Sequence, residues 1–165
     1  MTKNRENAQI SVAQASDQPA ILDLIPMLAD FDVPAARNPD DLWMSDAELI
    51  RQHFAGSAPQ TRVLVVKGAE QQLLGFALVS IGEEPLSHAS NAHLEAIVVA
   101  PEGRGLGLGR RLMAATEHLA REEGVSSVTL NAFANNRRAR NLYESLGFDG
   151  ELIRYIKRLP SEPSA

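Results

Sequence analysis

The stretch from Ala92 to Phe133 limits the fold of this chain more than any other part of the sequence. It begins with an apolar run that is typical of a strand, and a glycine-rich turn then leads into an amphipathic helix that ends near Gly124. A second strand pattern covers Ser127–Phe133. A strand, a helix and a strand in this order form a right-handed crossover between parallel strands. The segment therefore predicts parallel strands with a helix packed across them.

The residues before Ala92 add antiparallel strands and two helices. Strand patterns cover residues 9–15, 62–67 and 73–81. A polar turn joins the last two strands, which predicts a hairpin. Helical spacing covers residues 21–28, where Pro26 is expected to kink or end the helix. Ser45 to Glu48 fits a capping box, which predicts a second short helix.

A short helix closed by Gly147 and one or two final strands within residues 148–159 complete the pattern. We therefore predict a single-domain α/β fold over residues 9–159. Its sheet is mixed and mostly antiparallel, with a central parallel β-α-β unit and helices on both faces. Residues 1–8 and 160–165 are polar or proline-rich and are predicted to be flexible tails.

Composition and charge exclude several classes of protein. The 165 residues include no cysteine, so a disulfide framework cannot form. No apolar run is long enough to span a bilayer, and the polar stretch Met1–Gln9 lacks the apolar core of a secretory signal. The net charge of -5 argues against general nucleic-acid binding. We therefore expect a cytoplasmic protein without a membrane or nucleic-acid partner.

The turn before the predicted helix is the first candidate binding site. It reads Arg104-Gly105-Leu106-Gly107-Leu108-Gly109. Glycines let a backbone approach a ligand closely, and a helix start directs unpaired N–H groups and a positive dipole end at the turn. Such a turn suits phosphate or pyrophosphate. Its G-x-G-x-G spacing differs from the G-x-G-x-x-G of dinucleotide sites, and no lysine follows the glycines as in nucleotide-triphosphate loops.

Arginines gather in two short stretches of this acidic chain. One stretch holds Arg104, Arg110 and Arg111, and the other holds Arg137, Arg138 and Arg140. Each arginine taken alone is explained by a solvated helix surface. The two clusters together favour a small polyanionic ligand.

A second motif, which ends at Phe148, joins the glycine turn in a resemblance to a known family. Asn136-x-x-Ala139-x-x-Leu142-Tyr143 and the closing Leu146-Gly147-Phe148 are similar to a motif of the GNAT superfamily of acyl-CoA-dependent N-acetyltransferases. Arg104-x-x-Gly107-x-Gly109 is similar to that family's Arg/Gln-x-x-Gly-x-Gly/Ala pyrophosphate loop. The two motifs in this order are highly specific. The resemblance is strongest over Leu94–Phe148 and weak before Arg62.

The resemblance implies acetyl-CoA as the cosubstrate, and no metal. The backbone of one strand would bind the pantetheine arm, the glycine turn the pyrophosphate, and the start of the last helix another part of the cofactor. The cofactor-binding residues implied in this way are Ile97, Val98, Val99, Arg104, Gly105, Leu106, Gly107, Leu108, Gly109, Arg110, Asn136 and Tyr143.

Two residues are candidates for catalysis. Glu95 is the only ionisable residue between Leu94 and Ala100, and the two-residue period places it on one face with Ile97 and Val99. It is a candidate base for the attacking amine, and the alternative is a structural glutamate. The resemblance implies that Tyr143 gives a proton to the leaving CoA thiolate. The alternative for Tyr143 is a core aromatic, since it continues the apolar stripe of its helix.

The acceptor is less well defined by the sequence. In the family the acceptor groove is shaped by loops that here carry Asp30, Asp32, Asp40, Asp41, Glu83 and Glu84. This acidic character favours a small-molecule amine such as a polyamine, an aminoglycoside or an amino acid, although solubilising surface charge explains it equally well. The other hypotheses are acetylation of a protein lysine or N-terminus, and a non-catalytic acyl-CoA-binding module. The resemblance also adds a homodimer as an expected assembly, because homodimers are common in the family.

Overall fold

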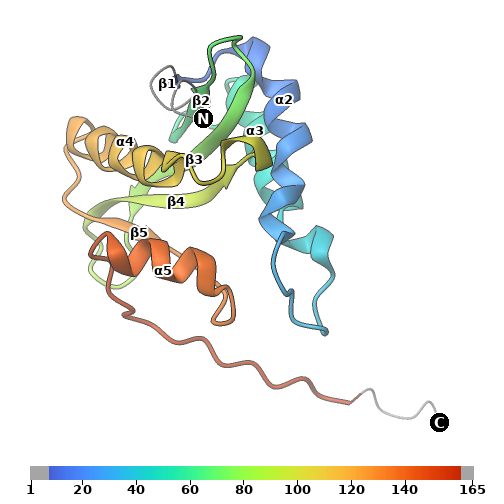
Figure 1. The fold of residues 1–165 in the computed structure, drawn as a ribbon. Coiled ribbons are helices and arrows are strands. Elements are labelled where there is room, and N and C mark those ends of the chain that lie inside the picture. Colours follow the sequence, from blue (N-terminus) through green and yellow to red (C-terminus); the bar gives the residue numbers. More distant parts are fainter. Residues whose placement is uncertain (1–7, 161–165) are drawn as a thin grey trace.

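The computed structural model describes residues 8–160, which build one sheet between two layers of helices (Figure 1). The strands follow the order of the chain across the sheet as β1 (Gln9–Val12), β2 (Thr61–Lys67), β3 (Leu73–Glu83), β4 (Ser90–Val99) and β5 (Val128–Leu130). Neighbouring strands are antiparallel from β1 to β4, and β4 and β5 run parallel. The predicted mixed, mostly antiparallel sheet with a parallel β-α-β unit is therefore confirmed.

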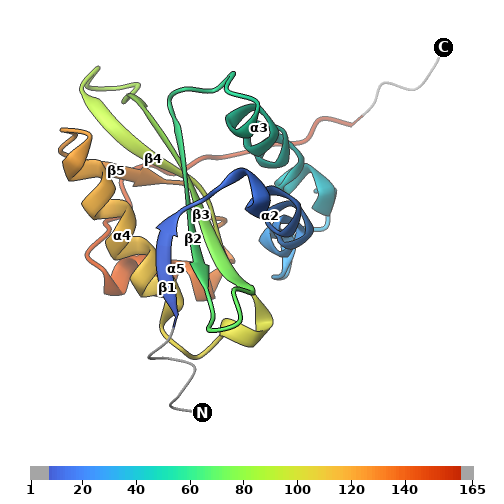
Figure 2. The same cartoon turned by 90° about the horizontal axis from the view of Figure 1, so that it is seen from above.

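Helices cover both faces of the sheet, as predicted (Figure 2). They are α2 (Gln18–Leu24), α3 (Met44–Phe54), α4 (Leu108–Glu122) and α5 (Arg137–Ser145), with short 3-10 turns η1 (Ala15–Asp17), η2 (Ile25–Ala29), η3 (Pro39–Leu42) and η4 (Pro101–Gly103). No helix in the described part of the chain has the length and apolar character needed to cross a membrane.

Each layer of helices has its own apolar core against the sheet. The core beneath α4 and α5 includes Leu112 and Met113, and the core beneath α2 and α3 includes Ile21, Ile50 and Phe76; all five side chains are fully buried. Burial of such a side chain contributes about 1.5–3 kcal/mol. The two cores therefore hold the sheet rigidly from both sides.

The early helices show one correct and one wrong prediction. Pro26 ends the α-helical segment at Leu24, and the chain continues as the tighter turn η2. The cause is the missing N–H of proline. The predicted capping box is wrong, because α3 already begins at Met44 with Trp43 at the N-cap and no side-chain capping bond. Ser45 therefore lies inside the first turn and not at the position from which a serine caps a helix.

The central strand β4 changes its pairing at Glu95. On the β3 side, Leu94 pairs with Val79 and Ala96 pairs with Leu78, so Glu95 is the extra residue of a β-bulge. On the other side, β5 pairs with β4 at Ala92–Leu94 and the ladder ends there. Beyond Leu94 the two parallel strands separate, and the backbone of β4 on that side has no strand beside it.

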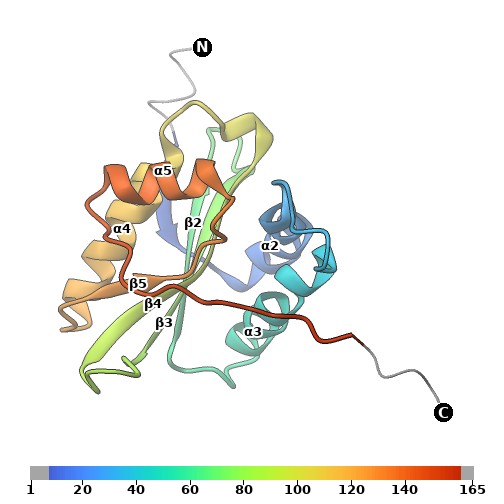
Figure 3. The ribbon, with the colours of Figure 1, turned by 90° about the horizontal axis from the view of Figure 1, so that it is seen from below.

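The final strands predicted within residues 148–159 are not formed. Residues 149–160 run as an exposed segment without helix or strand, and it leads away from the sheet (Figure 3). Its apolar residues, which suggested a strand, are exposed: Leu152, Ile153, Tyr155, Ile156 and Leu159. A strand exists only when its backbone pairs with another edge, and this segment pairs with none in the described chain. Phe148 is therefore the last residue of the described chain that packs against a core.

The predicted tails lie mostly outside the described residues, because residues 1–7 and 161–165 are not among them. The prediction places Ala8 in the first tail, but Ala8 is 3% exposed, and its carbonyl accepts a hydrogen bond of 2.6 Å from Arg111. Ala8 is therefore packed against the domain.

Candidate active site

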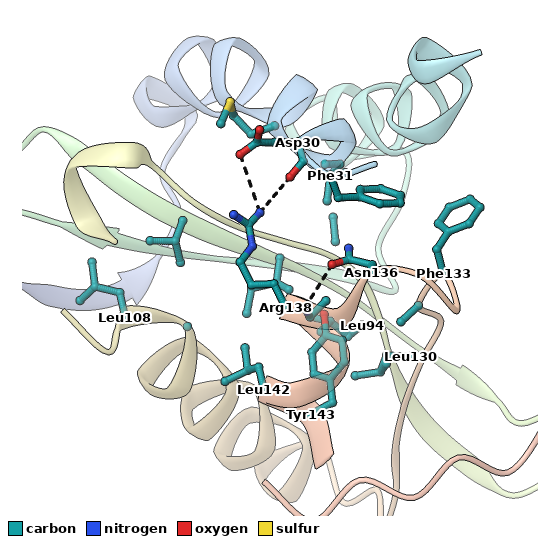
Figure 4. A pocket seen from close by; sticks show the side chains of 18 of the residues that line it. Asp30, Phe31, Leu94, Leu108, Leu130, Phe133, Asn136, Arg138, Leu142 and Tyr143 are labelled. Carbon is teal, nitrogen blue, oxygen red and sulfur yellow. Dashed lines mark hydrogen bonds and ion pairs between the residues drawn. The ribbon is translucent and has the colours of Figure 1, made fainter. Parts of the chain in front are cut away.

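A cavity of about 550 Å³ lies where β4 and β5 separate. Its walls come from β4, from the glycine turn with the start of α4, from α5 with the loop before it, and from η2, η3 and α3 (Figure 4). These elements are far apart in the sequence, so the fold and not one local motif creates the cavity. Cavities of this size accommodate small-molecule ligands.

The glycine turn shapes one end of the cavity. Gly105 and Gly107 have φ angles of 74° and 73°, in the left-handed region that suits glycine. Gly107 is the N-cap of α4, and no side chain caps this helix. The N–H groups of its first turn are therefore free to bind an anion. Leu108 and Gly109 from that turn line the cavity.

Most residues that the resemblance implicated lie together here. All the predicted cofactor-binding residues except Val98 and Leu106 line the cavity, and so do both predicted catalytic residues. The side chain of Val98 packs in the core beneath α2 and α3, and Leu106 packs against the opposite core. Val98 is expected to bind the cofactor through its backbone. The direction of the Val98 side chain therefore does not test this expectation.

Only some of the arginines of the two clusters line the cavity. Arg104, Arg110 and Arg138 line the cavity. Arg110 donates a hydrogen bond of 2.7 Å to Ser145 Oγ and thereby ties α4 to α5. Arg111 points away from the cavity, toward the carbonyl of Ala8. The anion site can therefore draw on arginines from both clusters, but not on Arg111.

Asp30 connects two walls of the cavity. Its carboxylate lies 2.5 Å from Arg104 Nη2. The carboxylate also lies 3.7 Å from Arg138 Nη2, and the Asp30 carbonyl accepts a hydrogen bond of 3.1 Å from Arg138 (Figure 4). Beside this ion pair, the rings of Phe31 and Phe133 lie 5.4 Å apart between centroids. The loop after η2 and the loop before α5 therefore contact each other beside the cavity.

Glu95 enters the cavity from the bulge of β4. Ile97 and Val99 also line the cavity. The bulge interrupts the alternation of side chains along β4, so the two-residue period does not explain why Glu95 lies with them. Glu95 Oε2 lies 3.9 Å from His93 Nε2, and His93 Nδ1 lies 2.8 Å from Thr129 Oγ1. The carboxylate is half-buried and faces the cavity, which is the placement expected of a base.

Asp46 is a second carboxyl group in the cavity, and the sequence did not indicate it. It projects from the first turn of α3. Burial, together with the nearby charge of Glu95, raises the pKa of Asp46 to about 7. The sequence pattern assigned this tetrapeptide to helix capping, and α3 and β4 are brought together only by tertiary packing.

Two polar side chains, Tyr143 in α5 and Asn136 at the N-cap of α5, also line the cavity. Tyr143 is 9% exposed, and burial raises the pKa of its phenol. Figure 4 shows its hydroxyl directed into the cavity, and its ring packs edge-on against Phe148 with centroids 6.0 Å apart. Asn136 caps α5 by accepting a hydrogen bond of 3.2 Å from the Ala139 N–H, which leaves its side-chain amide N–H₂ for a ligand.

The acidic loops contribute less than predicted to the cavity. Asp30 lines it, whereas Asp32, Asp40, Asp41, Glu83 and Glu84 do not. Glu84 caps its own turn through the N–H groups of Leu86 and Ser87. The acidic groups of the cavity are therefore Asp30, Asp46 and Glu95, two of which the loop argument missed.

Comparison with known proteins gives one consistent result. Residues 26–148 match the Acetyltransferase (GNAT) family. The thialysine N-epsilon-acetyltransferase of Bos taurus is 31% identical over 144 residues, which cover 84% of this chain and 82% of that protein. The mycothiol acetyltransferase of Renibacterium salmoninarum is 35% identical over 77 residues, which cover 47% of this chain. The matched part spans only 23% of that relative's length.

The fold has similar solved structures. The structure described as a putative acetyl transferase from Pyrococcus furiosus superposes with a TM-score of 0.75, covering 92% of this chain and 99% of that one. The two sequences are 20% identical, so this similarity concerns the fold alone.

Proposed function

Because the chain belongs to the acetyltransferase (GNAT) family, we propose that it transfers an acetyl group from acetyl-CoA to a primary amine of a small molecule by direct attack. One observation carries the proposal. A single cavity combines the uncapped start of α4, which suits a pyrophosphate, with a carboxylate and a phenol that suit proton transfer, Glu95 and Tyr143.

The residues present fit the charged part of acetyl-CoA. The N–H groups that begin α4 bind the pyrophosphate, and Arg104 and Arg110 add positive charge beside them. The unpaired side of β4 near Ile97 and Val99 offers backbone groups to the pantetheine amides. No metal takes part in this scheme.

The chemical step needs a neutral amine, whereas aliphatic amines are mostly protonated at pH 7. Glu95 accepts one proton from the acceptor ammonium, and the amine nitrogen then attacks the thioester carbonyl carbon. The C–N bond forms, the C–S bond breaks, and the CoA thiolate takes the phenol proton of Tyr143. The second proton of the nitrogen restores the phenol. Holding both substrates in one cavity supplies much of the rate.

The cavity favours a small cationic acceptor. Its acidic groups attract an ammonium, and its volume of about 550 Å³ suits a small molecule better than a folded protein. The name of the Bos taurus relative, a thialysine N-epsilon-acetyltransferase, is that of an enzyme for an amino-acid-like amine. Acetylation of a protein lysine or N-terminus is the second hypothesis. A non-catalytic acyl-CoA-binding module would leave Glu95 and Tyr143 without a role in the cavity.

The test is a screen of the purified protein with acetyl-CoA against polyamines, aminoglycosides, amino acids and peptides, following release of free CoA thiol. The absence of cysteine keeps the protein itself from reacting with a thiol reagent. Release with one small-molecule class supports the proposal and names the acceptor. Release with peptides alone would favour the second hypothesis, and binding of acetyl-CoA without release would favour the module.

A homodimer in the cytoplasm is part of the same proposal. The support for a dimer is the exposed apolar side chains of residues 152–159, among them Tyr155 at 88% exposure. A second copy of the chain would bury them. Sedimentation analysis should give a dimer for the full chain and a monomer for Ile153→Asp. A monomer for the full chain would rule the dimer out.

A further inference from the structure

We propose that Asp46 is a second proton acceptor of this site, and that Asp46 and Glu95 together bind the ammonium group of the acceptor. The inference rests on the proposed function and extends it to the acceptor's chemical class. It starts from a placement that the sequence did not predict. Two carboxylates, one from α3 and one from the bulge of β4, line the same cavity.

Asp46 is half-buried, and its surroundings lack the groups that usually pair with a carboxylate. Within residues 8–160, the Asp46 side chain makes no hydrogen bond or ion pair, whereas Glu95 has His93 at 3.9 Å. The residues that η2 and η3 contribute to the same wall are apolar: Met27, Leu28 and Leu42. A half-buried carboxylate against an apolar wall is stabilised by a proton or by a cationic ligand.

The remaining ionisable groups of the cavity do not neutralise Asp46. The cationic ones are the arginines at positions 104, 110 and 138, and the others are Asp30, Glu95 and Tyr143. Arg104 and Arg138 pair with Asp30, and Arg110 bonds to Ser145. The group whose charge acts on Asp46 is Glu95, and like charges favour a shared proton. An incoming ammonium replaces that proton as the compensating positive charge.

This arrangement defines the acceptor as a primary alkylammonium. The ammonium is held by two carboxylates, and the methylene groups next to it lie along the apolar wall of Met27, Leu28 and Leu42. The ammonium gives one proton to Asp46 or Glu95, and that proton then leaves to solvent. The neutral nitrogen forms the bond to the acetyl carbon while the bond to sulfur breaks, and its second proton ends on the CoA thiol.

Kinetics with 1,4-diaminobutane as the probe test the role in proton transfer. Asp46→Asn is expected to lower kcat/KM for the amine at pH 7 by roughly a hundredfold, within the range seen for loss of a general base. The deficit should shrink toward pH 10, where more of the amine is already neutral, while the Kd for acetyl-CoA stays the same. Asp41→Asn, the same change at an exposed residue outside the cavity, should match the wild type. A deficit that is equal at every pH, or no deficit, would overturn the inference.

Carbon-13 NMR of the Asp46 carboxyl provides a readout without turnover. The Asp46 titration midpoint should fall in Glu95→Gln, because the neighbouring charge is gone, and adding 1,4-diaminobutane to the wild type should also lower it. If neither change moves the midpoint, Asp46 does not share the site with Glu95 and an ammonium, and the inference fails. Failure of the proposed function can be distinguished from failure of this inference. In that case the wild type would acetylate no amine, whatever the NMR result.

Discussion

Arg104 Nη2 lies 2.5 Å from the carboxylate of Asp30, so the arginine beside the glycine turn is already paired with a residue from the opposite wall of the cavity. Both side chains are about two-fifths exposed. An incoming pyrophosphate must therefore compete with Asp30 for the same guanidinium. Cofactor binding and the contact between Arg104 and Asp30 are therefore linked.

Removing the competing carboxylate should strengthen cofactor binding. We expect Asp30→Asn to lower the Kd for acetyl-CoA by up to about fivefold at low salt, since an exposed ion pair is worth up to about 1 kcal/mol. Calorimetry measures the change. Asp32→Asn is the matched control, because Asp32 is exposed and does not line the cavity. Unchanged or weaker binding in Asp30→Asn would mean that Asp30 does not oppose the cofactor.

Charge placed in the glycine turn should abolish cofactor binding. Gly107→Glu puts a carboxylate at the start of α4, where the N–H groups are to bind the pyrophosphate. Gly56→Glu controls for backbone strain, because Gly56 has a φ of 76° and lies in open space away from the cavity. Each change costs roughly 1–2 kcal/mol in strain. Only Gly107→Glu should lose acetyl-CoA binding by calorimetry, and retained binding in a folded protein would refute the turn as the anion site.

The phenol of Tyr143 should matter for turnover more than for affinity. Tyr143→Phe keeps the buried ring and its packing against Phe148 but removes the proton. We expect kcat to fall roughly a hundredfold or more while the Kd for acetyl-CoA stays within about twofold. Tyr155→Phe, at an exposed position, is the control. A Tyr143→Phe variant with the wild-type kcat would show that water or another group protonates the thiolate.

The raised pKa of Asp46 predicts a pH-dependent effect on stability. The folded pKa of about 7 exceeds the ordinary value of 3.8, so the folded state holds this proton more tightly than the unfolded state. The proton on Asp46 stabilises the folded state fully below pH 3.8, and this stabilisation is lost as the pH rises to about 7. Asp46→Asn should therefore raise Tm relative to the wild type more at pH 8 than at pH 4. An equal difference in Tm at both pH values would contradict the shift.

The sequence predicted the parts of the site that depend on local chemistry. The glycine turn followed by a helix start needs only a few consecutive residues, and Tyr143 and Asn136 belong to a motif within one short helix. Their convergence follows from the parallel unit of β4, α4 and β5, whose handedness is fixed by strand twist. The glycine turn could be predicted because its signal is local, whereas the roles of Tyr143 and Asn136 rest on the family resemblance of their motif and stay predictions.

The features that the sequence did not reveal arise from tertiary contacts. The bulge at Glu95 lies in an apolar run in which a shift of one residue leaves the pattern unchanged. Asp46 becomes part of the site only because α3 packs across the sheet, and its own tetrapeptide resembles a helix cap. The segment 149–160 carries apolar residues that favour a strand, but such residues do not supply the neighbouring edge that a strand requires.

The most direct test of the central claim is the mass of the amine after incubation with acetyl-CoA and the purified protein. The account predicts that the wild type adds one acetyl group to a small primary amine, with release of one equivalent of CoA, and that Gly107→Glu adds none. A wild-type protein that binds acetyl-CoA but leaves every small amine of the panel unmodified would contradict it.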